Sequence, residues 1–115
     1  MDQASNIMVL GKKWNSPIFL ERTVKGVTYR RRLKNWKELD CRRPDVDNFS
    51  WGYFGEGPSC TSYSILRALF DRVTAEDYAF PFLANFVSKV PQGSALKISG
   101  EEVCLILGLK PKQKR

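Results

Sequence analysis

Glu56 and Cys60 are the residues whose types and positions come closest to chemistry. They stand at the end of a glycine-rich run from Trp51 to Pro58 and at the start of an expected helix. A carboxylate there could act as a general acid or base, and a helix N-terminus favours a thiolate. However, the chain contains no histidine, which is the commonest general base near neutral pH. We therefore expect no catalytic residue, with a small enzyme or ligand-binding domain using this loop as an alternative.

The same run invites comparison with phosphate-binding loops, because free N–H groups at a helix N-terminus attract anions. The details argue against such a site. Pro58 follows Gly57 where a P-loop needs lysine and Ser/Thr, and Glu56 would place a negative charge beside the phosphate. Cys60 stands where the dinucleotide pattern needs its third glycine. We expect instead an architectural turn that lets Trp51 and Tyr53 pack.

Metal and cofactor sites are not expected either. Four oxygen ligands could gather near the middle of the chain, but their spacing matches no calcium loop and Arg42 and Arg43 lie among them. These ligands are Asp40, Asp45, Asp47 and Asn48. The three cysteines, Cys41, Cys60 and Cys104, form no C-x-x-C pair. The sequence thus lacks the clustered ligands that zinc requires.

Glycines in the run permit a backbone path that most residues cannot follow, and Pro58 suits the first position of a helix. Apolar residues then recur at helical spacing over residues 59–73, which predicts an amphipathic helix. Its expected buried stripe is Tyr63, Leu66, Leu69, Phe70 and Val73. The structural residues of the loop are Trp51, Gly52, Tyr53, Gly55, Gly57 and Pro58.

The pattern Phe49-x-Trp51-Gly52-Tyr53-x-Gly55-x-Gly57-Pro58, followed by two helices and Val90-Pro91, resembles an uncharacterised small domain family of bacteria and their phages. That family has the signature F-x-W-G-Y-G-G-S-G-P, and the resemblance covers residues 7 to 107. Phe54 replaces the usual second glycine, and residues 43–48 replace a polar segment with histidine. The resemblance implies a fold and a bacterial or phage setting, and it brings no activity.

Before the loop, residues 7–10 read as a strand, and residues 18–24 and 27–33 as a hairpin about Lys25-Gly26. This turn pairs Val24 with Val27, Arg22 with Tyr29, Leu20 with Arg31 and Ile18 with Leu33. That face is mainly apolar and should meet the helices. The opposite face carries Glu21, Thr28, Arg30, Arg32 and Lys34. Residues 35–48 read as a loop with a possible short strand at 36–39.

After the first helix, Thr74 reads as the N-cap of a segment that runs to Val90. Within it, Pro81 either kinks the helix or marks its true start, and Phe82, Phe86 and Val90 are expected to point inward. Residues 95–98 could form a last strand. Ser99 to Glu102 form a capping box for a helix over 101–107, which Gly108 ends. We predict one α+β domain over residues 1–109, a small antiparallel sheet with two to three helices packed on one face, and a basic flexible tail over 110–115.

A net charge of +7 and a pI near 9.5 favour acidic neighbours. The densest basic residues are Arg30, Arg32, Lys34, Lys37, Arg42 and Arg43. They predict a partner-binding face for an acidic protein or nucleoprotein complex, with direct nucleic-acid binding as an alternative and a solvated strand face as the plainest interpretation. Together with the bacterial or phage setting that the resemblance implies, they favour an accessory protein of phage or mobile-element type as the expected function, including inhibition of a host defence complex in the manner of an anti-CRISPR protein.

A bacterial cytoplasmic location is the expectation for this chain. The apolar stretch at 103–107 is far shorter than the ~20 residues that span a bilayer, and the first residues lack the basic start of a signal peptide. No membrane partner is therefore expected, while the oligomeric state stays open.

Overall fold

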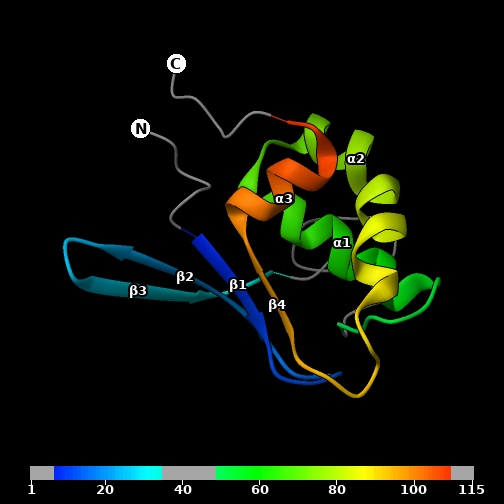
Figure 1. The fold of residues 1–115 in the computed structure, drawn as a ribbon, viewed down its shortest axis with the longest axis horizontal. Helices are drawn as coiled ribbons and strands as arrows, with labels where there is room; N and C mark the ends of the chain where they lie inside the picture. Colours follow the sequence, from blue (N-terminus) through cyan, green and yellow to red (C-terminus); the bar gives the residue numbers. More distant parts are fainter. Residues whose placement is uncertain (1–6, 35–48, 110–115) are drawn as a thin grey trace.

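The computed structural model describes residues 7–34 and 49–109, which form a four-stranded antiparallel sheet, three α-helices and one short 3-10 helix (Figure 1). Strand order in the sheet is β3-β2-β1-β4. The elements in chain order are β1 (Ile7–Gly11), β2 (Ile18–Val24), β3 (Val27–Arg32), α1 (Glu56–Leu69), α2 (Arg72–Asn85), η2 (Val87–Lys89), β4 (Leu96–Ser99) and α3 (Gly100–Leu107). This arrangement confirms the α+β class.

The β2–β3 hairpin has the register that its turn predicts. Arg22 lies opposite Tyr29 and Val24 opposite Val27, and the Leu33 backbone N–H donates to the Ile18 carbonyl at 2.7 Å. Lys25 and Gly26 both have positive φ, 51° and 80°. Two such residues make the type I′ turn whose twist matches that of the two strands.

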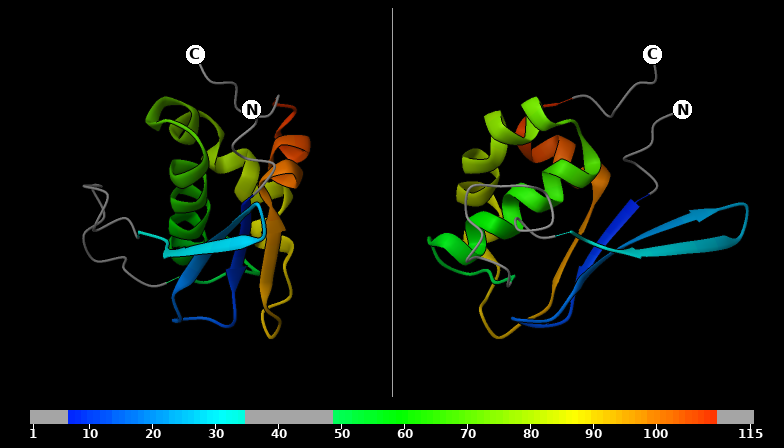
Figure 2. Two further views of the ribbon diagram at one scale, coloured as in Figure 1. Left: turned by 90° about the vertical axis from the view of Figure 1, so that its left-hand side faces the viewer. Right: turned by 180° about the vertical axis from the view of Figure 1, so that it is seen from behind.

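The helices pack on one face of the sheet (Figure 2). Alternate residues of β1, β2 and β4 turn inward and are buried against them, as strand geometry requires. The sheet contributes Val9, Ile18, Leu20, Leu96 and Ile98 to the core, and the rest of the chain contributes Trp51, Ile65, Leu66, Phe82, Val87 and Val103. One continuous core therefore joins the sheet and the helices.

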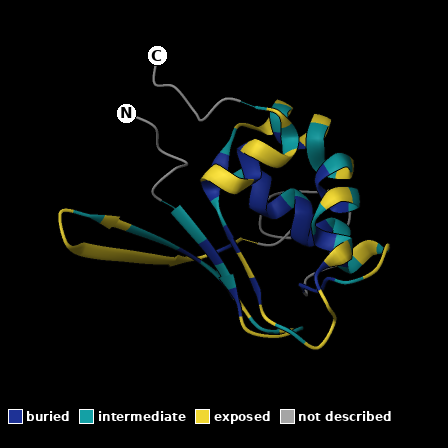
Figure 3. Cartoon of the chain, in the orientation of Figure 1, coloured by how far each residue is buried: buried dark blue, intermediate teal, exposed yellow. Residues whose placement is uncertain are grey.

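The outer half of the hairpin departs from the prediction that one face would meet the helices. All six residues of β3 are exposed, including Val27 at 52% and Tyr29 at 61% (Figure 3). β1 pairs with β2 only from Ile18 to Arg22. Beyond that point the hairpin is a two-stranded arm that extends past the helices (Figure 1). Only the half of the predicted face that contains Ile18, Leu20 and Leu33 is buried.

Helix α1 begins and ends earlier than the predicted range of 59–73. It spans Glu56–Leu69 because the Ser59 N–H donates to the Gly55 carbonyl at 3.0 Å, which closes the first turn. Pro58 is therefore the third helical residue and not the first. It is tolerated there because N–H groups in the first turn have no helical acceptor. Val73, predicted to be buried, lies in the next helix and is 66% exposed.

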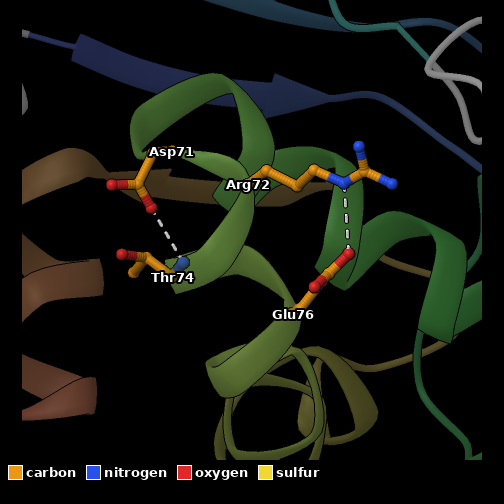
Figure 4. Close-up of polar contacts among 4 residues, drawn as sticks. All are labelled: Asp71, Arg72, Thr74 and Glu76. Atoms are coloured by element: carbon orange, nitrogen blue, oxygen red, sulfur yellow. Dashed lines mark hydrogen bonds and ion pairs between the residues drawn. The ribbon is translucent and has the colours of Figure 1, made fainter.

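The N-cap of α2 is Asp71, so the prediction of Thr74 for this position is wrong. An Asp71 carboxylate oxygen accepts from the Thr74 N–H at 2.8 Å, and Arg72 Nε lies 3.2 Å from Glu76 Oε2 one turn along (Figure 4). Thr74 thus supplies the donor at the third position of the helix, while the capping acceptor comes three residues earlier.

Pro81 lies inside α2, which runs without interruption from Arg72 to Asn85. Of the two alternatives for Pro81, a helix that starts near this residue is therefore excluded. Asp77, whose carbonyl loses its helical donor at the proline, is exposed, so water can replace that donor. Phe82 and Val90 are buried as predicted, and Phe86 is half-buried. The chain reaches Val90 through η2.

The C-terminal elements match the sequence pattern closely. The Ser99 hydroxyl accepts from the Glu102 N–H and the Glu102 carboxylate accepts from the Ser99 N–H, both at 3.0 Å. Gly108 follows α3 in the left-handed conformation, at φ 70°. The capping box and the glycine stop are thus confirmed, and β4 begins at Leu96, one residue later than expected.

Candidate interaction surface

Trp51, the first residue of the glycine-rich run, is fully buried and joins three parts of the chain. Its Nε1 donates to the Ser94 carbonyl at 3.0 Å, just before β4. Its own carbonyl accepts from Trp14 Nε1 at 3.1 Å, in the β1–β2 connection. Since the run leads directly into α1, this one residue, through its indole and its backbone carbonyl, connects the helix to both sheet connections.

The glycines of the run allow close packing of the loop against its neighbours. Gly52 has φ +93°, and a Cβ at this residue would lie 2.7 Å from the Val90 carbonyl oxygen. A Cβ at Gly57 would collide with Ser50 Oγ, which lies 3.1 Å from the Tyr53 hydroxyl. The ring of Tyr53 also contacts that of Trp14, at 5.6 Å between centroids. These contacts give the run a packing role.

Phe54, the residue that replaces the second glycine of the resembled signature, points outward. It is 61% exposed, and its ring centroid lies 6.2 Å from that of Phe80 on α2. This contact of two exposed rings connects the loop to α2. The two rings do not enclose any of the pockets described for this structure.

The two residues of the enzyme alternative do not share a cleft. Cys60 is completely buried, with Sγ 3.9 Å from Ser64 Oγ, while Glu56 is exposed. Three of the best-formed hollows on residues 7–34 and 49–109 are described by their lining residues, and neither Glu56 nor Cys60 lines any of these three. A reaction needs its groups around a space for the substrate, and these three hollows provide no such space for the two residues.

A row of four side chains crosses the sheet on the face away from the helices. Register places Arg32 beside Phe19, Phe19 beside Leu10, and Leu10 beside Lys97. We call these four residues the outer row. With strands ~4.8 Å apart, the row extends over about 14 Å. It has two half-buried apolar side chains in the middle and an exposed cation at each end.

A groove of about 580 Å³ lies along this row and is lined by Leu10, Phe19 and Lys97, together with Lys12 and Arg30. The Arg30 guanidinium carbon lies 4.0 Å from the centroid of the Phe19 ring, and its Nε lies 3.6 Å from a carboxylate oxygen of Glu21, which also lines the groove. Arg30 remains 53% exposed. A cation over an aromatic face is held in place by the ring electrons, so Arg30 is positioned above the apolar floor.

Lys34 was expected to share a face with Arg30 and Arg32, but it lies beside a different hollow. Strand β3 ends at Arg32, so regular alternation does not reach Lys34. Together with Arg31 and with Arg67 of α1, it lines a hollow of about 180 Å³ on the helix side of the sheet. The predicted basic face is therefore divided between two surfaces.

The remaining basic residues of the prediction, Lys37, Arg42 and Arg43, lie outside the described residues, as do the suggested strand at 36–39 and the basic tail. Sequence reasoning missed Lys12 and Lys97. Lys97 stands between Leu96 and Ile98, so alternation already places it on the polar face of its strand. What the sequence did not reveal is that β4 pairs with β1, which brings Lys97 next to Leu10.

Two further searches bear on the earlier expectations. Over residues 7–34 and 49–109, no cluster of three side chains is suited to hold a metal ion; the aspartates considered for that role lie outside these ranges. Within the same part of the chain, no helix combines the length and the apolar character needed to cross a membrane.

Comparison with known proteins gives one match. The model of a family described as "Family of unknown function (DUF6166)" matches residues 20–106, which include most of the hairpin, the glycine-rich run, α1, α2, β4 and all but the last residue of α3. No curated protein and no solved structure matches the chain.

Proposed function

Because the chain belongs to the Family of unknown function (DUF6166), whose description names no activity, we propose a function from its surface. The protein acts by binding, and the outer row of its sheet engages an acidic surface of a partner protein. The observation that carries this proposal is the arrangement of Arg32, Phe19, Leu10 and Lys97 across four paired strands.

The chemistry of the row favours a protein partner. Interfaces bury an apolar centre inside a polar rim, and Phe19 with Leu10 provides such a centre between two cations. Carboxylates of a partner could pair with Arg32 and Lys97, and charge-assisted hydrogen bonds of this kind are stronger than neutral ones. The net charge of +7 would add long-range attraction to an acidic partner.

Nucleic acid fits the same row less well. Bases bind by stacking on exposed aromatic faces, and the one aromatic ring of the outer row is already covered on one face by Arg30. Leu10 provides no stacking surface. The proposal includes a nucleoprotein complex as the partner, provided that the protein component of the complex supplies the acidic surface. The accessory role in a phage setting, with inhibition of host defence, remains a prediction of the sequence.

Capture from the lysate of the cell that naturally contains the protein tests the proposal. The bait is wild type or the double variant Arg32→Glu and Lys97→Glu, and the lysate is treated with nuclease. Lys13→Glu with Lys89→Glu is the matched control, because it changes the net charge equally at two exposed lysines outside the outer row. Captured proteins are identified by mass spectrometry.

We expect one protein to be recovered by wild type and by the control after nuclease treatment, and to be lost from the outer-row variant. Equal loss in both variants would mean that net charge alone attracts the partner, which contradicts the proposal. Recovery of nucleic acid alone, lost steeply as salt rises, would establish the nucleic-acid alternative.

A further inference from the structure

Strand β3 forms one edge of the sheet that residues 7–34 and 49–109 build, and no other strand of this part of the chain lies along that edge. In an antiparallel pair, alternate residues turn both backbone groups toward the same neighbour. Leu33 donates to Ile18 of β2, so Tyr29 and Arg31 also face β2. The N–H and C=O of Thr28 and Arg30 therefore point away from the sheet, and no strand among the described residues pairs with them.

Side chains near this edge have an apolar side and a cationic side. Val27 and Tyr29 are 52% and 61% exposed on the face that continues the core, which the helices of the described residues do not reach. Arg30 extends on the opposite face. Arg31 shares the face of Tyr29 but lies opposite Leu20, where β2 is still paired with β1. Exposed apolar side chains beside unpaired backbone groups are the features to which an extended peptide adds as a strand.

The charge of the edge decides which strand can be added. Two copies of β3 paired antiparallel through this edge bring the two Arg30 side chains together, directly opposite each other when the pair is centred on Arg30 and diagonally when it is centred on Tyr29. Like charges in such neighbouring positions destabilise a sheet. A second copy of this chain is therefore a poor occupant. A partner segment with carboxylates opposite Arg30 and apolar side chains beside Val27 and Tyr29 matches the positive charge of one face and the apolar character of the other.

We propose that an extended segment of the partner protein, with acidic and apolar residues in alternation, adds to β3 as an antiparallel fifth strand. This inference rests on the proposed function, since it assumes the same acidic partner, and it states how the partner's backbone binds. The added strand carries its carboxylates onto the outer face, next to the outer row, and its apolar residues against Tyr29.

A synthetic peptide tests this mode directly. The probe is a fluorescein-labelled hexapeptide of alternating Glu and Val, and its binding to the full chain is measured by fluorescence anisotropy. In antiparallel pairing, the residue opposite Arg30 exchanges both backbone hydrogen bonds with it. The Glu N–H groups therefore face β3, and the Val N–H groups face away.

Two N-methylated peptides have the same charge and composition but block different N–H groups. Methylation of the Glu nitrogens should weaken binding at least about tenfold, the equivalent of ~1.4 kcal/mol, while methylation of the Val nitrogens should leave affinity unchanged. Equal affinity of both methylated peptides and the parent, or equal loss in both, would overturn strand addition. Loss only on Val methylation would overturn the antiparallel orientation.

A matched pair of protein variants tests the same backbone. Thr28→Pro removes an outward N–H and leaves every arginine and the β2–β3 hydrogen bonds in place, because proline is tolerated where the N–H faces away from the sheet. Thr28→Val is the control: both variants lose the hydroxyl contact with Thr23, which is 3.0 Å in length. We expect about tenfold weaker peptide binding in Thr28→Pro alone. Equal affinity of the two variants would contradict the proposal.

Circular dichroism and thermal unfolding show whether Thr28→Pro is folded. The methylated peptides test backbone pairing without any change to the protein.

The two proposals can fail separately. If the peptide results show no backbone pairing while the Arg32 and Lys97 reversal still abolishes capture, the outer row binds the partner by side chains alone.

Discussion

Gly52 shows how strongly one residue can be constrained when two chain segments meet. Its φ of +93° lies in the region that side chains disfavour, and the Val90 carbonyl oxygen occupies the space that a Cβ would enter. The Gly52 N–H also donates to the Val87 carbonyl at 2.9 Å, which ties the glycine-rich run to η2. The same backbone path could not be followed by an L-residue without strain.

Replacement of this glycine should therefore lower stability. We expect Gly52→Ala to reduce the free energy of unfolding by about 1–3 kcal/mol, the usual cost of a residue held in a sparsely populated backbone conformation. Chemical denaturation followed by circular dichroism measures the change. Gly93→Ala is the control, because a Cβ there meets nothing within 4 Å and its φ is not in the left-handed region. Equal stability of the two variants would refute this account of the loop.

At the scale of elements, the best-predicted features are those whose hydrogen bonds are local. The capping box of α3 and the type I′ turn each lie within a few residues, so their residue types suffice to identify them. The N-cap of α2 was misplaced because Asp71 and Thr74 are both capping residues by type. Only the position where α1 ends, at Leu69, selects between them.

The cap of α3 can be tested by itself. We expect Ser99→Ala to destabilise the protein by about 1 kcal/mol, because the Glu102 N–H loses its acceptor. Ser99→Asp keeps an acceptor at the same place and should retain most of the wild-type stability. Thermal unfolding of the three proteins gives the comparison, and an alanine variant as stable as the aspartate variant would show that the cap contributes nothing.

The hairpin arm should open more readily than the rest of the sheet. Residues beyond Arg22 on β2 lack a β1 neighbour, and β3 has no buried residue, so few apolar contacts oppose local opening. Hydrogen exchange followed by mass spectrometry should show early exchange at residues 23–30 and late exchange in β1, which is paired on both sides. Uniform protection over the sheet would contradict this expectation.

At the scale of the whole molecule, a single core joins the sheet, the loop and the helices, and it encloses two thiols. Cys60 and Cys104 are 0% and 1% exposed, from α1 and α3 respectively. Both lie inside the one cooperative unit that the core defines, so a reagent reaches them only when that unit opens.

Thiol labelling measures this opening. In a Cys41→Ser variant, we expect both remaining cysteines to react with a disulfide reagent about 10³-fold or more slowly than in denaturant, because a folded domain opens only rarely. Fast labelling of Cys60 under native conditions would instead indicate an accessible thiol, and it would revive the enzyme alternative for the glycine-rich loop.

By itself, the sequence determined the α+β class, the hairpin register and the two caps of α3, since strand alternation, turn chemistry and capping depend on neighbouring residues. Tertiary structure alone decided the surface. Lys97 joins Phe19 because β4 pairs with β1, and Val27 and Tyr29 are exposed because the helices end before the hairpin does. Both facts depend on which distant segments pack together. The burial of one common core determines that packing, and local residue patterns do not encode it.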